Sequence, residues 1–274
     1  MNSVRHSIFF WAALLVLPAS SLFGQEIPPE LLDDDHVREE FGVNQFTAPA
    51  IGKVLDDLAR FKPIDYSTLA RPFPQAVVRA RPQLALNFGI LIADGCLIVE
   101  AEVTGPVEDF GRALLRLATS LALRDEVARH SKSLMSLAEN AQWGEVENEL
   151  AATQRDVERA MVRYRDEEVA HLVGVGGWLR GIEILSGALQ SDYSKENATR
   201  LLRVDILDYF IERLEMFQGP AARNAGVREA LSAFKTIRSL LGDAEGKPPS
   251  LAVTTEINRV AGIAVKRIET MPSR

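Results

Sequence analysis

The sequence predicts an all-α protein, a single irregular antiparallel bundle of about eight helices preceded by an extended N-terminal arm. Two observations carry this prediction. After residue 80 the chain is a succession of segments whose apolar residues recur at three- and four-residue spacing, separated by short turn signals, as in antiparallel helices joined by short loops. No alternating run of apolar and polar residues is long enough to require a strand.

The beginning of the chain, residues 1–24, has the layout of a signal peptide that is removed on export. Arg5 and His6 form a basic start, residues 8–17 are apolar, and small residues follow. Crossing a bilayer takes roughly 20 residues of helix, so this shorter run does not make a permanent membrane anchor. Cleavage after Ser21 and cleavage after Gly24 both fit the pattern. We therefore expect an exported protein with no permanent membrane span after signal cleavage.

Residues 25–80 are expected to form the N-terminal arm. The stretch 25–47 combines prolines, an acidic run and little apolar periodicity, which is typical of a mobile or loosely docked segment. One helix is predicted over residues 49–61. Prolines interrupt any long element between residues 62 and 82, so this part should wrap over the surface of the bundle.

The helical bundle itself is expected to cover residues 81–274. Its first helix is apolar on nearly every side, which indicates a helix buried all round at the centre of the fold. The longest helix should end at the glycine-rich stretch 174–177. Gly177 and Gly181 should then allow close contact or a kink between that helix and the next one. The predicted helices cover residues 81–102, 104–121, 124–140, 144–173, 178–189, 194–217, 227–241 and 250–271.

Composition excludes several classes of function. The net charge of −7 argues against a nucleic-acid partner, because a basic patch supplies most of the affinity in such complexes. The single cysteine, Cys96, cannot form an internal disulfide, and its apolar neighbours favour a small core residue over a reactive thiol. The chain has no G-x-S-x-G, H-E-x-x-H or G-x-G-x-x-G motif, so the sequence predicts no cofactor.

Candidate functional residues are polar groups that helical geometry turns inward, where an unpaired group is costly. Asn87 and Asp94 are seven residues apart in the central helix and share a face. Arg180 and Glu183 lie one turn apart in the second apolar helix. We predict that Asp94 or Glu100 pairs with Arg180. A structural ion pair that fixes helix register is the favoured interpretation, and a ligand site is the other.

Glu168 and His171 form a further candidate pair. The Glu-x-x-His spacing places both side chains on one helix face, as in the ligand pairs of di-iron bundles. Those bundles need two such pairs and two further glutamates, and a second histidine would require His130 to approach His171. The sequence therefore favours a hydrogen-bonded packing histidine and predicts no metal site.

Three stretches, together with the export signal, carry a resemblance to known sequences: RPQLALNFGILIADG (81–95), HLVGVGGWLRGIEIL (171–185) and DYFIERL (208–214). In these stretches the chain resembles a group of uncharacterised exported bacterial proteins that are all helical. The resemblance spans most of the chain after residue 80. It implies a periplasmic or secreted bacterial protein, and it implies no activity, ligand or catalytic residue.

Two functions are compatible with these observations. The favoured one is a non-catalytic interaction or structural protein of the cell envelope, with a protein partner there. The alternative is a small-ligand-binding protein or enzyme with a pocket between the helices 82–102 and 174–189. In that case four groups should line one cavity that opens to solvent: Asp94, Glu168, His171 and Arg180. A closed cluster of paired groups would favour the first function.

Overall fold

The computed structural model describes residues 58–74, 80–164, 166–242 and 247–271, and these residues form helices and loops with no strand among them. The predicted all-α class and the predicted bundle are confirmed. The predicted signal peptide, the first part of the arm and most of the predicted helix 49–61 lie outside the described residues.

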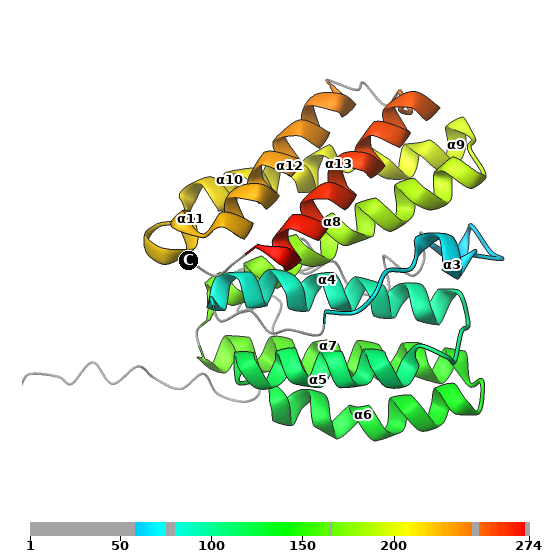
Figure 1. Ribbon diagram of the computed structural model, residues 1–274, viewed down its shortest axis with the longest axis vertical. Helices are drawn as coiled ribbons and strands as arrows, with labels where there is room; N and C mark the ends of the chain where they lie inside the picture. Colours follow the sequence, from blue (N-terminus) through cyan, green and yellow to red (C-terminus); the bar gives the residue numbers. More distant parts are fainter. Residues whose placement is uncertain (1–57, 75–79, 165, 243–246, 272–274) are drawn as a thin grey trace, which may run out of the picture.

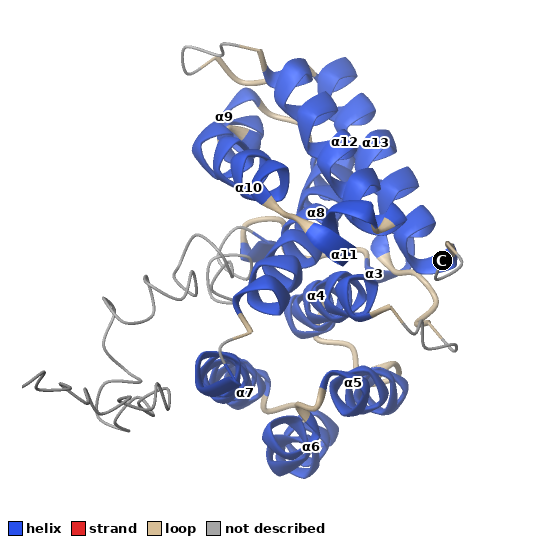
Figure 2. Ribbon diagram, turned by 90° about the vertical axis from the view of Figure 1, so that its left-hand side faces the viewer, coloured by secondary structure: helices blue, strands red, loops and turns tan. Residues whose placement is uncertain are grey.

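Two long helices, α4 (Arg81–Glu100) and α8 (Glu167–Ser191), pack against each other at the centre of the molecule (Figure 1). One group of helices packs on the α4 side of this pair: α5 (Val107–Leu121), α6 (Arg124–Glu139) and α7 (Trp143–Tyr164). A second group packs on the α8 side: α10 (Val204–Met216), α12 (Ala225–Leu241) and α13 (Leu251–Thr270). Figure 2 shows the two groups on opposite sides of the central pair. The short helices are α3 (Tyr66–Leu69), α9 (Lys195–Ala198), the 3₁₀ helix η2 (Thr199–Leu201) and α11 (Gly219–Arg223).

Helix α4 is buried along nearly its whole length, as its apolar sequence predicts. Its neighbours bury one stripe each, because their apolar residues keep the three- and four-residue spacing. Aromatic side chains bind the second group together: the rings of Phe210 and Phe234 stack with centroids 5.6 Å apart and join α10 to α12. The core therefore forms around α4 and α8, and each outer helix contributes one face to it.

Glycines set the distance between α4 and α8. A Cβ atom at Gly89 would lie 1.9 Å from the backbone oxygen of Val173, and one at Gly176 would lie 2.0 Å from that of Leu86. The two backbones therefore touch where the helices cross. The sequence placed a close contact or kink at Gly177 and Gly181, between the predicted helices 144–173 and 178–189. A Cβ at Gly177 would meet its nearest atom, the Gly89 backbone oxygen of α4, at an ordinary 3.5 Å, and one at Gly181 would meet nothing within 4 Å.

The glycine-rich stretch 174–177 does not end a helix, which corrects the predicted division into helices 144–173 and 178–189. Helix α7 ends at Tyr164, and α8 then runs without a break from Glu167 to Ser191. The carboxylates of Glu167 and Glu168 occupy the first turn of α8, where they suit the positive end of the helix dipole. Within this stretch, Gly176 lies directly against the backbone of α4, which explains a glycine in the interior of the helix.

The predicted helix 194–217 is also divided. Ser194 caps the short α9, because its hydroxyl accepts a hydrogen bond from the backbone N–H of Asn197 over 3.0 Å. Helix α10 begins only at Val204, after Arg203 adopts a non-helical backbone conformation and places its guanidinium 5.7 Å from the ring centroid of Trp178. The other helices of the bundle agree with the predicted ranges to within a few residues.

Both central helices are long and apolar enough to cross a membrane by length and composition. In the folded chain 89% of the apolar window of α4 and 67% of that of α8 are buried among other helices. The core helices of soluble proteins have the same length and composition, so these two helices do not by themselves indicate a membrane span.

The helix crossing yields the first prediction. Gly176→Ala should lower the free energy of unfolding by about 2 to 3 kcal/mol, because the added methyl group overlaps the Leu86 carbonyl and forces α4 and α8 apart. The matched control is Gly181→Ala, in the same helix with open space at the Cβ position, which should raise the free energy of unfolding by up to about 1 kcal/mol through helix propensity. Urea unfolding followed by circular dichroism measures both, and equal effects would contradict the assigned crossing.

Candidate functional site

Asp94 and Arg180 meet in the core, at the contact between α4 and α8. The Nε atom of Arg180 donates a hydrogen bond to Asp94 Oδ1 over 2.8 Å, and the two side chains are only 2% and 4% exposed. The prediction that Asp94 or Glu100 pairs with Arg180 is therefore confirmed for Asp94. Glu100 instead faces Lys62, with 3.3 Å between Glu100 Oε2 and Lys62 Nζ.

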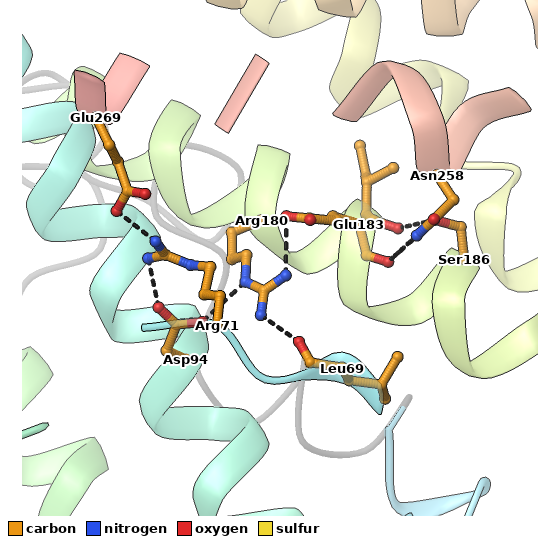
Figure 3. Close-up of polar contacts among 9 residues, drawn as sticks. Leu69, Arg71, Asp94, Arg180, Glu183, Ser186, Asn258 and Glu269 are labelled. Carbon is orange, nitrogen blue, oxygen red and sulfur yellow. Dashed lines mark hydrogen bonds and ion pairs between the residues drawn. The ribbon is translucent and has the colours of Figure 1, made fainter. Parts of the chain in front are cut away.

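A second guanidinium, that of Arg71, reaches the same carboxylate from the segment that follows α3 (Figure 3). Its Nη2 atom donates to Asp94 Oδ2 over 2.5 Å, and its Nη1 atom donates to Glu269 near the end of α13. The two oxygens of Asp94 therefore accept from two different arginines. Each oxygen is therefore paired with a guanidinium group inside the core, which holds the carboxylate in its charged form between two cations.

The guanidinium of Arg180 is fully engaged as well. Its Nη1 atom lies 2.8 Å from Glu183 Oε2, and its Nη2 atom donates to the backbone oxygen of Leu69 over 2.6 Å. Each of its three nitrogens thus lies within 2.8 Å of an oxygen: Nε and Nη2 donate hydrogen bonds, and Nη1 forms an ion pair. We use the name ion cluster for the following residues: Leu69, Arg71, Asp94, Arg180, Glu183 and Glu269.

Helix α13 is tied to the ion cluster through the backbone of α8. The side-chain amide of Asn258 donates to the backbone oxygen of Glu183 over 2.7 Å and to Ser186 Oγ over 3.3 Å (Figure 3). A Cβ atom at Gly262 would lie 2.9 Å from Glu183 Oε1, so α13 approaches closely at this point. The cluster therefore joins α4, α8, α13 and the segment after α3.

The electrostatics of the ion cluster follow from its composition of two guanidinium groups and three carboxylates. Burial raises the pKa of the Glu269 carboxyl above its ordinary value, and the neighbouring charge of Arg71 opposes this shift. Burial also raises the pKa of the nearby Tyr66 hydroxyl, and the negative charge of Asp94 acts in the same direction. Arginine remains charged, so the cluster is held by charge pairing rather than by neutral hydrogen bonds.

His171 lies in α8 beside α10, apart from the ion cluster. Its Nδ1 atom lies 2.7 Å from the backbone oxygen of Glu167, and its Nε2 atom lies 3.1 Å from the Tyr209 hydroxyl. A carbonyl only accepts, so Nδ1 carries the proton and Nε2 accepts from Tyr209. Burial lowers the pKa of His171, which keeps the ring neutral. His171 is therefore a hydrogen-bonded packing residue, as the sequence favoured.

The remaining candidates do not join these groups. Glu168 is exposed at the first turn of α8 and does not share an interaction with His171 in the described part of the chain. Asn87 is 2% exposed, and its Oδ1 atom accepts no hydrogen bond from the described residues. The structure thus brings together Asp94, Arg180 and Glu183, and it leaves Asn87, Glu168 and His171 separate.

No group of three or more histidine, cysteine, aspartate or glutamate side chains that could hold a metal ion occurs among the described residues. His130 faces α7 rather than His171. Its ring nitrogens lie 3.0 Å from Glu149 Oε1 and 3.1 Å from Asp156 Oδ2. The two histidines of the considered metal pair therefore have separate partners.

Sequence reasoning missed Arg71, Glu269 and the Leu69 carbonyl. Arg71 lies in a proline-rich stretch without periodicity, and Glu269 lies next to the apolar stripe of a surface helix, where charged residues are ordinary. One signal was present in the sequence: a buried carboxylate that meets a single arginine still has an oxygen in need of a donor, which calls for a second cation.

Asp94→Ala should lower the free energy of unfolding by about 3 kcal/mol, because it leaves the two guanidinium groups without their shared partner. Thermal or urea unfolding measures the change. The matched control is Glu256→Ala, which removes an exposed ion pair with Arg259 on α13 and should leave stability unchanged within error. An Asp94→Ala protein as stable as this control would show that the ion cluster does not stabilise the fold.

The free energy of unfolding should also depend on the protonation of His171. Its pKa is lowered in the folded protein, so between the folded value and the ordinary value of 6.5 the unfolded chain binds a proton that the folded protein does not. This contribution makes stability fall as the pH drops below about 6.5 and level off below the folded pKa. His171→Gln, which keeps a donor and an acceptor, should show a shallower fall in urea unfolding at pH 7.5 to 5. Identical slopes for both proteins would contradict this assignment.

No family model, curated protein or solved structure matches this chain. Among the predicted polar groups, Asp94, Arg180 and Glu183 are paired with one another at the contact between α4 and α8.

Proposed function

We propose that this protein is a non-catalytic helical protein of the bacterial cell envelope, periplasmic or secreted, that acts by binding another protein or as a structural component. The observation that carries the proposal is the closure of the ion cluster. Both oxygens of Asp94 accept from arginines, and all three nitrogens of Arg180 lie within 2.8 Å of an oxygen. Groups in this arrangement hold chain segments together and are not free to act on a substrate.

Two further residues support a role without catalysis. Burial raises the pKa of the Cys96 thiol to about 12, so the nucleophilic thiolate is absent at neutral pH. The Nε2 atom of His171 faces the Tyr209 hydroxyl and its Nδ1 atom faces a backbone carbonyl. Neither residue is presented to a substrate in the way that a nucleophile or a general base requires.

The alternative function is a small-ligand-binding protein or enzyme with a pocket between α4 and the second half of α8. Asp94, Glu168, His171 and Arg180 would have to line that pocket together. Contact between the α4 and α8 backbones where Gly89 and Gly176 lie leaves little room at the crossing, and Glu168 and His171 have other surroundings than the ion cluster. These features favour the interaction or structural role.

The experiment is affinity capture of the full chain, tagged at its C-terminus, from the exported fraction of its native host. We expect processing of the leader after residue 21 or 24 and recovery of a polypeptide in a fixed ratio to the tagged chain. The matched control is a chain that begins at residue 25, which should stay in the cytoplasm. Binding of the purified polypeptide is then measured with both proteins in solution.

Two outcomes would contradict the proposal. Equal export of the full chain and of the chain that begins at residue 25 would contradict the envelope location. Recovery of a small molecule in a fixed ratio, with turnover or binding lost in Asp94→Asn, would instead support the alternative pocket.

A further inference from the structure

A cavity of about 30 Å³ lies inside the group formed by α4, α5, α6 and α7, away from the ion cluster. Figure 2 views these four helices nearly end-on, with α4 opposite α6 and with α5 and α7 on the two flanks. A cavity needs roughly 10 to 15 Å³ in this measure to hold one water molecule. The space is therefore large enough to admit more than one methyl-sized group.

The lining of the cavity is apolar. Its floor consists of buried residues from all four helices: Gly95, Ile98, Val99, Leu114, Leu134 and Leu150. Ser131 carries the one polar side chain at the wall, and its hydroxyl already donates to the backbone oxygen of Ala128 over 3.0 Å. The Ser131 hydroxyl can still accept a hydrogen bond, and the surface of the wall is otherwise apolar. The chemistry of the wall therefore selects an apolar occupant.

The cavity is partly open, and half-buried residues stand around its opening. Val107 and Gly111 come from α5, Met135 comes from α6, and Trp143 begins α7. Methionine side chains adapt to the shape of what they contact, and tryptophan offers a broad apolar surface. An opening of this composition allows a chain to enter with its end in the cavity while a polar head remains in water.

Gly111, a half-buried residue of α5, has open space at its Cβ position. It lines the cavity, and a Cβ atom built there meets no atom within 4 Å. Glycine in the interior of a helix costs about 1 kcal/mol relative to alanine. The position therefore combines an unfavourable helix residue with room for a larger one, and a side chain introduced there would occupy the same space as a ligand.

We propose that the α4–α7 cavity binds the end of an unbranched alkyl chain, as found in a fatty acid or a lipid. The apolar wall, the Ser131 hydroxyl that already donates within its own helix and the opening beside Met135 and Trp143 together fit this class of ligand. The site is separate from the ion cluster, and the inference does not depend on export or on a protein partner.

The test uses the full chain with Trp11→Phe and Trp178→Phe, so that Trp143 at the opening is the fluorescent reporter. The probes are octanoate, decanoate and dodecanoate below their micelle concentrations. We expect a saturable change in Trp143 emission and an affinity that rises by up to about 4-fold per added methylene, the factor that corresponds to transfer of one methylene out of water.

Gly111→Leu should abolish this saturable change, because its side chain fills the cavity. Gly181→Leu is the matched control: it replaces another helical glycine that has open space at its Cβ position, but it lies outside the cavity and should bind as the parent does. Gly111→Ala adds a single methyl group and should bind the fatty acids less tightly than the parent but more tightly than Gly111→Leu. This variant keeps the test valid if Gly111→Leu fails to fold. No saturable change in the parent, or equal binding by parent and both Gly111 variants, overturns the proposal.

A further arm distinguishes the two sources of the chain. Vesicles of phosphatidylcholine replace the free fatty acids in the same titration. Binding of dodecanoate alone identifies a free chain as the ligand, and a response to vesicles that Gly111→Leu abolishes identifies a chain drawn from a bilayer. Either result supports the proposal, and the difference between them shows whether the bound alkyl chain belongs to a free fatty acid or to a lipid of the bilayer.

Discussion

The direct contact between the backbones of α4 and α8 is the constraint on which the rest of the structure depends. Gly89 and Gly176 remove the side chains that would otherwise separate the helices. Asp94 follows Gly89 by little more than one turn, and Arg180 follows Gly176 by one turn, so the crossing brings their side chains within 2.8 Å. With larger residues at the crossing, the same two charges would lie farther apart in an apolar core, where an unpaired charge is costly. Packing and charge pairing therefore specify the same arrangement.

The ion cluster contributes specificity of arrangement more than net stability. A buried ion pair recovers little more than its cost of desolvation, whereas removal of one partner is severe. Arg71, in the segment after α3, extends the pair to α13 through Glu269, and the Leu69 carbonyl adds the end of α3 itself. Four separate parts of the chain must therefore be in place before every charge has its partner. A misplaced α13 or a detached segment after α3 would leave a buried charge unpaired, and this penalty favours the single observed packing.

The sequence was sufficient for the helical class, for the central helix and for the pairing of Asp94 with Arg180, because charges in helices that are apolar on all sides have to face one another. It was misleading at residues 174–177, where glycines that serve helix contact look like a helix end. Glu168 and His171 share a helix face by spacing, but Glu168 is exposed and His171, one turn later, is buried. Spacing alone does not reveal where along the helix burial begins. Arg71 and Glu269 were beyond reach, because their roles arise only when distant segments meet. Local patterns thus specified the elements, and the contacts between elements required the fold.

The burial of α4 on all sides has a consequence for the biosynthesis of the chain. Its main partner, α8, begins at residue 167, whereas α4 ends at residue 100. A ribosome adds roughly 5 to 20 residues per second, so the apolar surface of α4 waits several seconds for the segment that covers it. During this interval the three helices α5, α6 and α7 can shield only one flank. The nascent chain therefore exposes a long apolar helix before its main packing partner has been synthesised.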